Sequence, residues 1–95
     1  MARFVAPGVA HHVTQRGTSR QRVFLCRYDR RVYLELLREQ ARHTGTSILA
    51  YCLMPNHVHL IAVPADEDGL AVLLRRVHRR FAQYFNARRL RTGHL

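Results

Sequence analysis

The sequence predicts an α+β domain with the ferredoxin-like element order strand, helix, strand, strand, helix, in which two helices cover one face of an antiparallel sheet. Three observations predict this class. Two segments carry apolar residues at helical spacing, an apolar run in the middle of the chain is split by a short turn, and an alternating segment precedes them. Because 95 residues support one core only, we predict a single domain over residues 1–95.

The first strand is predicted over residues 9–16. It follows a Pro-Gly pair, which is typical of a turn, and its side chains alternate between two mixed faces. One face carries His12, Thr14 and Arg16, and the other carries Val9, His11, Val13 and Gln15. The polar residues 17–22 then predict a basic loop.

The first helix is predicted over residues 29–43. Asp29 is a suitable N-cap, and Gly45 is a suitable residue to end the helix. Between them, apolar side chains recur at the spacing of one helix face, at Val32, Tyr33, Leu36, Leu37 and Ala41.

Two antiparallel strands and a second helix follow. The strands are predicted over residues 47–53 and 57–63, and their short Met-Pro-Asn connection requires the antiparallel arrangement. The helix is predicted over residues 68–88 with Asp66 or Asp68 as its cap. Residues 89–95 resemble a tail, so the final strand of a complete ferredoxin-like unit is not visible. The apolar stripe of the second helix consists of Leu70, Leu73, Leu74, Val77, Phe81, Tyr84 and Phe85.

The charge balance predicts an anionic partner. The chain has 16 basic residues, all of them arginine, against 6 acidic ones, and its formal net charge is +10. Such a charge in a small domain is typical of a nucleic-acid binder, because arginine engages phosphate with two hydrogen bonds. No segment has the roughly 20 apolar residues of a membrane span, and the N-terminus does not resemble a signal peptide. We therefore expect no membrane partner.

The two cysteines predict a reducing compartment. Cys26 and Cys52 lack the spacing of a metal or redox motif, so we expect reduced thiols in a cytoplasmic protein. Cys52 lies within the apolar run and is expected in the core.

Two histidines form a candidate metal site. His57 and His59 are two positions apart on a predicted strand, so their side chains project from the same face. Most such pairs in strands are half-exposed surface histidines, but this pair lies in an apolar run, which favours a metal-binding role. A third ligand would come from elsewhere, and at most one of His11 and His12 could share that face of the sheet.

The arginines form candidate nucleic-acid contacts. Residues 75–80 place four guanidinium groups and one imidazole within two helical turns, and no acidic residue occurs from residue 69 onward. A solvated helix face is the usual explanation for a charged run, but such a face normally mixes signs, and like charges four positions apart repel. An anionic partner would relieve that repulsion. The candidates are Arg75, Arg76, Arg79 and Arg80 on the second helix, with Arg16, Arg20 and Arg22 in and after the first strand.

Several segments resemble a known family. The segments around Ala2-Arg3 and Pro7-Gly8, the string His11-His12-Val13-Thr14-Gln15-Arg16-Gly17, and the long string from Ala50 to Ile61 closely resemble the REP-associated, single-tyrosine transposases. These insertion-sequence transposases belong to the HUH class, in which U is a bulky apolar residue, here Val58. The resemblance covers nearly the whole chain in order.

The resemblance implies a fold, a cofactor and a reaction. It implies a ferredoxin-like domain whose two histidines, here His57 and His59, hold Mg²⁺ or Mn²⁺ beside the scissile phosphate of single-stranded DNA, often next to a hairpin. It also implies a tyrosine on a later helix that attacks the phosphorus and forms a 5′-phosphotyrosine, so that the DNA strand is cleaved and rejoined. Members of the family usually act as homodimers.

The tyrosines of this chain depart from the family pattern. The family places its nucleophile in a Tyr-xxx-Asn or Tyr-xxx-Gln helix, and none of Tyr28, Tyr33, Tyr51 and Tyr84 has such a partner four residues later. We therefore expect the nucleophile beyond residue 95, as in a truncated gene, a fragment or a degenerate copy. The apolar stripe assigns Tyr84 to the core rather than to catalysis, and a missing final strand would leave a sheet edge open for dimerisation.

Two other functions are compatible with the sequence. One is a DNA-binding remnant of a transposase without catalysis, for which substitution of His57 would leave DNA binding intact. The other is a metal-dependent hydrolase of a different kind, which would release hydrolysed product without any protein adduct.

Overall fold

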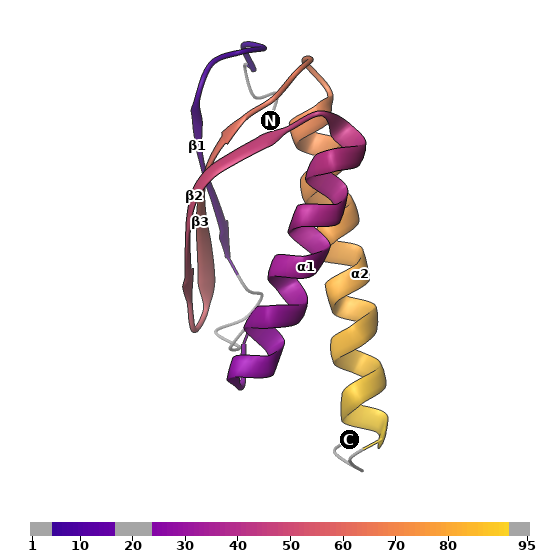
Figure 1. The fold of residues 1–95 in the computed structure, drawn as a ribbon. Helices are drawn as coiled ribbons and strands as arrows, with labels where there is room; N and C mark the ends of the chain where they lie inside the picture. The colour runs from indigo at the N-terminus through magenta and orange to yellow at the C-terminus, as the bar shows by residue number, and fades with distance from the viewer. Residues whose placement is uncertain (1–4, 17–23, 92–95) are drawn as a thin grey trace.

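The computed structural model describes residues 5–16 and 24–91, and its element order agrees with the prediction. The chain forms β1 (His11–Arg16), α1 (Arg27–Thr44), β2 (Ser47–Met54), β3 (His57–Val63) and α2 (Gly69–Arg91) (Figure 1). Arg20 and Arg22, two of the predicted nucleic-acid contacts, lie outside the described residues.

The three strands form one sheet in the order β1-β3-β2. β3 is central and pairs antiparallel with both neighbours, so β1 and β2 run parallel to each other. The chain passes from β1 to β2 through α1, and β3 then inserts between them, which is the split β-α-β arrangement of ferredoxin-like domains. The predicted α+β class is confirmed.

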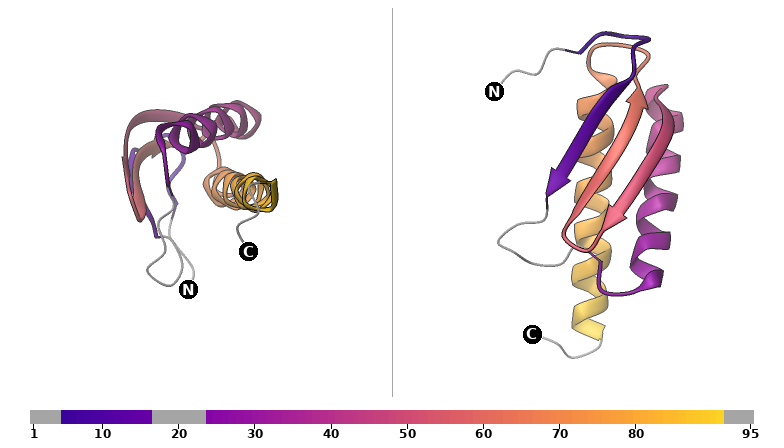
Figure 2. Two further views of the ribbon diagram at one scale, coloured as in Figure 1. Left: turned by 90° about the horizontal axis from the view of Figure 1, so that it is seen from below. Right: turned by 90° about the vertical axis from the view of Figure 1, so that its left-hand side faces the viewer.

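Both helices pack on the same face of the sheet. Figure 1 shows α1 and α2 side by side next to the sheet, and the right-hand view of Figure 2 shows them behind the strands. No helix of the described residues lies on the other face of the sheet. We call these the helix-bearing face and the outward face. The central strand has alternating burial, because Val58, Leu60 and Ala62 point toward the helices and the residues between them point outward.

The core lies between the sheet and the helices. Val13 from β1 and the inward side chains of β3 meet apolar side chains of both helices there. Burying each of these larger side chains stabilises the fold by about 1.5–3 kcal/mol. The helical contributors with little or no exposure are Tyr33, Leu37 and Ala41 from α1, and Leu70, Leu73, Val77 and Phe81 from α2.

The start of α1 differs from the prediction. The helix begins at Arg27 with Cys26 at the N-cap, which makes no side-chain cap hydrogen bond, so the assignment of Asp29 as N-cap was wrong. Asp29 lies in the first turn, and its Oδ2 accepts a hydrogen bond from the backbone N–H of Leu25 at 2.8 Å. An acid at this position can reach back to the chain before the helix, which stabilises the entry without being the cap.

The other helix ends agree more closely. Gly45 ends α1 with φ +66°, in the left-handed region that glycine adopts readily. Asp66, rather than Asp68, bonds to the start of α2, because its Oδ1 accepts from the N–H groups of Asp68 and Gly69 at 3.0 and 2.6 Å. α2 extends to Arg91, so part of the segment predicted as a tail is helical.

The helices of the described residues include none that is both long and apolar enough to cross a membrane.

Candidate functional site

His57 and His59 lie side by side on the outward face of β3, as their spacing predicts. Both are partly exposed, and they alternate with the buried Val58 and Leu60. Their ring centroids are 4.9 Å apart with an interplanar angle of 75°. Because the strand is central and hydrogen-bonded on both sides, the backbone fixes the two imidazoles relative to each other.

Each of these imidazoles has its Nδ1 atom engaged. Nδ1 of His57 lies 2.7 Å from Oδ1 of Asn56, and an amide oxygen can only accept, so this nitrogen carries the proton. Nδ1 of His59 lies 3.1 Å from Nε2 of His12 and 3.4 Å from Oγ1 of Thr14. In a neutral imidazole that is protonated on Nδ1, Nε2 is free to bind a metal.

His12 is a site residue that the sequence did not single out. Its ring lies nearly parallel to that of His59, with centroids 5.2 Å apart and an interplanar angle of 9°. The register places Thr14 opposite His59, so His12 is a diagonal neighbour across the two strands. The alternation within residues 9–16 showed that one of His11 and His12 could share this face, but only the pairing of β1 with β3 identifies which one.

The outward face offers two imidazole ligands, not three. Within residues 5–16 and 24–91, no group of three or more histidine, cysteine, aspartate or glutamate side chains could hold a metal ion. Cys52, which was predicted to be in the core, is exposed and lies opposite His59 on β2, because β2 is an edge strand whose outward face carries no helix. The described residues therefore supply two imidazole ligands at this face.

Among the arginines predicted to contact nucleic acid, Arg16 lies next to the histidines. It lies opposite His57 in the β1–β3 register and is exposed. Residues opposite each other on paired strands project to the same face, with Cβ atoms about 5 Å apart. The guanidinium therefore belongs to the same surface as the imidazole pair and can reach a phosphate bound there.

The arginine run on α2 lies on the other side of the sheet. Arg75, Arg76, Arg79 and Arg80 are all exposed, but α2 packs against the helix-bearing face. A shallow hollow of about 400 Å³ separates this run from the edge of β1, and its lining consists of Gln15, Leu74, Arg75, His78 and Arg79. The fold thus divides the predicted nucleic-acid contacts into two surfaces.

One arginine of the run has an acidic neighbour that the sequence did not reveal. Nη1 of Arg80 lies 3.9 Å from Oε1 of Glu39, a residue of α1, with both side chains about half exposed. The segment from residue 69 onward contains no acidic residue, but in the folded chain Glu39 of α1 lies next to it. An exposed pair at this distance contributes little to stability.

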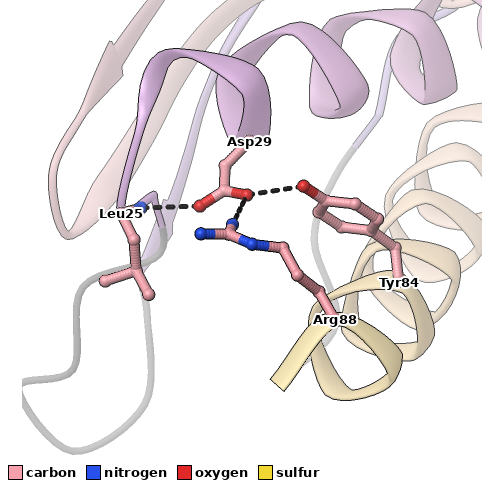
Figure 3. A network of polar contacts seen from close by, with 4 residues as sticks. All are labelled: Leu25, Asp29, Tyr84 and Arg88. Atoms are coloured by element: carbon pink, nitrogen blue, oxygen red, sulfur yellow. Dashed lines mark hydrogen bonds and ion pairs between the residues drawn. The ribbon is translucent and has the colours of Figure 1, made fainter. Parts of the chain in front are cut away.

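Tyr84 takes part in a polar cluster between the two helices (Figure 3). Its hydroxyl donates to Oδ1 of Asp29 at 2.6 Å, and the guanidinium of Arg88 donates to the same oxygen. Asp29 is fully buried, and its other oxygen accepts from Leu25. The cluster ties the first turn of α1 to the C-terminal part of α2.

The electrostatics of the cluster oppose a nucleophilic role for Tyr84. Desolvation, together with the hydrogen bond to Asp29, raises the pKa of Tyr84 to about 12, whereas a nucleophile needs easier deprotonation. Burial alone would raise the pKa of Asp29, but the hydrogen bonds from Tyr84, Leu25 and Arg88 outweigh it and lower that pKa. Tyr84 also packs against the core between the sheet and the helices, on the opposite side of the sheet from the outward imidazoles.

Comparison with known proteins adds one finding. The family model described as "Transposase IS200 like" matches residues 6–94, which is nearly the whole chain and includes both strands that carry the site. The searches of curated proteins and of solved structures gave no match.

Proposed function

The chain belongs to the IS200-like transposase family, and from this premise we propose that it binds single-stranded or hairpin DNA on the outward face of its sheet, where His57 and His59 hold Mg²⁺ or Mn²⁺. The observation that carries the proposal is the pair of adjacent imidazoles whose Nδ1 atoms are both engaged. When Nδ1 of His59 donates to His12, both imidazoles have an Nε2 lone pair at the outward face, with Arg16 beside them.

The donor set fits a divalent metal with open coordination positions. Imidazole nitrogen suits Mn²⁺ better than Mg²⁺, which prefers oxygen ligands and keeps several waters. Two protein ligands leave the remaining positions for water and phosphate oxygens, which is what a nucleic-acid substrate supplies. When bound, the ion would provide Lewis-acid polarisation of a phosphate group.

The residues of this chain would bind and orient the DNA. Arg16 would donate two hydrogen bonds to a phosphate beside the imidazoles, and the exposed, helix-free sheet gives a strand of DNA room to lie across it. The arginine run on α2 would hold a more distant part of the same DNA. We propose that Tyr84 is not the nucleophilic tyrosine, because its hydroxyl donates to Asp29 and its pKa is raised.

A homodimer is part of the proposal. β1 and β2 each have an unpaired edge in the described sheet, and an exposed edge strand readily pairs with another chain. β2 also exposes the large apolar side chains Leu49, Tyr51 and Met54. In a monomer these side chains would remain in contact with water, whereas a dimer interface could cover them. Light scattering coupled to size-exclusion chromatography would give twice the monomer mass if the chain is a homodimer.

The second candidate function is DNA binding without catalysis. The observation that favours it is again Tyr84, whose hydroxyl is engaged with Asp29 rather than directed to the outward face. This alternative predicts DNA binding that needs neither His57 nor a metal.

One assay separates the candidates. Labelled hairpin DNA from the flanks of the chain's own gene is mixed with the protein and Mn²⁺ and analysed on native and denaturing gels. The proposal predicts a native-gel shift that weakens in His57→Ala and when the metal is chelated, without a covalent adduct. A shift that is unaffected by both treatments would support the non-catalytic alternative. A protease-sensitive adduct on the denaturing gel would show that a tyrosine within these 95 residues is the nucleophile.

A further inference from the structure

We infer that His12 is a positioning residue, which accepts a hydrogen bond from Nδ1 of His59 and so keeps Nε2 of His59 free for a divalent metal. The inference deepens the proposed function and rests on it, because the role of His12 is defined by the metal site. His12 itself is not a ligand in this account, since the described residues bring no three ligating side chains together around one point.

The geometry around His59 supports a directed contact. The two rings are nearly parallel, at 9°, and Nε2 of His12 lies 3.1 Å from Nδ1 of His59, within hydrogen-bond range. Thr14 lies directly opposite His59 and places its Oγ1 3.4 Å from the same nitrogen. A ring nitrogen and a hydroxyl from β1 thus lie beside one nitrogen of His59, and each can accept a proton from it.

The position of that proton decides what His59 can do. A neutral imidazole carries one proton, on either Nδ1 or Nε2, and the hydrogen bond at one nitrogen sets the state of the other. If Nδ1 of His59 donates to His12, Nε2 has a free lone pair. If the acceptor is removed, part of the population carries the proton on Nε2 and cannot bind a metal through that atom.

His57 has an equivalent partner from a different element. Its Nδ1 donates to Oδ1 of Asn56 in the turn between β2 and β3, at 2.7 Å. With Nδ1 of His59 as the donor to His12, the two neighbouring imidazoles have the same tautomer, one held by a side chain of β1 and the other by a side chain of the turn. Partners that orient a metal-binding histidine in this way typically contribute about 10–100-fold to metal affinity.

The test uses three variants at two positions. His12→Phe keeps a flat ring but has no acceptor, whereas His12→Gln places an amide oxygen near the position of Nε2. His43→Ala removes an exposed imidazole from the last turn of α1 and serves as the matched control. Circular dichroism confirms that each variant is folded before it is compared.

Two readouts are measured on these proteins. Calorimetric titration with Mn²⁺ gives the metal affinity, and long-range ¹H–¹⁵N spectra of the metal-free proteins give the tautomer of His59. We expect His12→Phe to bind Mn²⁺ about 10–100-fold more weakly and to shift the proton of His59 toward Nε2. We expect His12→Gln to recover most of both properties, and His43→Ala to match the wild type.

The outcomes distinguish this inference from the function on which it rests. Wild-type affinity and an unchanged His59 tautomer in His12→Phe would overturn the role of His12 while leaving the metal site intact. If the wild type binds no Mn²⁺, the proposed metal site is wrong, and the tautomer of His59 still decides whether His12 positions it. Equal loss in His12→Phe and His12→Gln would also contradict the inference, because the acceptor would then not be what matters.

Discussion

The residues around His57 show why neighbours across the sheet matter as much as neighbours in the chain. The i, i+2 spacing on a strand is enough to place His57 and His59 on one face. Their hydrogen-bond partners come from β1 and from the β2–β3 turn, and Arg16 joins them through the strand register. The effect of replacing a single residue of this surface on DNA binding can therefore be predicted.

Replacement of Arg16 by alanine is expected to weaken binding of single-stranded DNA. Removing one phosphate contact on a single strand lowers the slope of log affinity against log salt concentration by about 0.7. Fluorescence anisotropy over a salt series measures that slope. Arg31→Ala removes the same charge from an exposed position on α1 and is the control. An identical loss in both variants would show that Arg16 acts through net charge alone.

The sequence predicted the imidazole pair but could not predict its partners. The pair follows from local alternation, which any strand imposes. The contact between His12 and His59 joins residues 47 positions apart, and it exists only because β1 pairs with β3 in one particular register. The contacts of Asp29 with Tyr84 and Arg88 could not be predicted for a similar reason, because these partners come from a helix more than 50 residues later.

At the scale of elements, the two helices are joined by apolar contacts and by the cluster around Asp29. Phe81 packs edge-on against Tyr33 of α1, with ring centroids 5.5 Å apart. Beyond it, the polar cluster of Asp29, Tyr84 and Arg88 holds the C-terminal part of α2 against the start of α1. The cluster is therefore expected to act on stability rather than on DNA binding.

Tyr84→Phe is expected to lower the free energy of unfolding by about 1–2 kcal/mol. The substitution removes one hydrogen bond to a charged, buried carboxylate and keeps the ring in place. Urea unfolding followed by circular dichroism measures the change. DNA binding on native gels should stay at the wild-type level, and a selective loss of binding without loss of stability would assign Tyr84 to the functional surface instead.

Acid is expected to weaken the same cluster. The pKa of Asp29 in the folded chain lies below its ordinary value of 3.8, so its carboxylate stabilises the fold fully above that value. The contribution is lost as the pH falls below 3.8 toward the folded pKa. The stability difference between wild type and Asp29→Asn, measured by urea unfolding at several pH values, should therefore be largest near neutrality and shrink in acid. A difference that is constant with pH would contradict this account.

At the scale of the whole molecule, the sheet separates two basic surfaces. The outward face carries the imidazoles and Arg16, and the helix-bearing side carries the arginine run of α2. The element order was predictable from periodicity, but this division was not, because it depends on which side of the sheet the helices cover. A single DNA that contacts both surfaces would pass the edge of β1, where Gln15 lies near Arg75 and Arg79.

The double variant Arg75→Ala/Arg79→Ala is expected to affect long DNA more than short DNA. A short oligonucleotide that covers only the outward face should bind with nearly wild-type affinity, whereas a longer strand should lose about 1.4 from its salt slope, two contacts of about 0.7 each. Anisotropy with a series of oligonucleotide lengths measures this. Arg31→Ala/Arg42→Ala removes two exposed charges from α1 as the control. A loss that is independent of length would show that the two surfaces do not share one DNA.

The most direct test of the proposed function is calorimetric titration of Mn²⁺ into the wild type, into His57→Ala/His59→Ala and into His43→Ala. We expect saturable binding in the wild type and in His43→Ala, and its loss in the double variant, because the outward imidazoles supply the protein's two ligands. Equal Mn²⁺ binding in the double variant, or no binding in the wild type, would contradict this expectation.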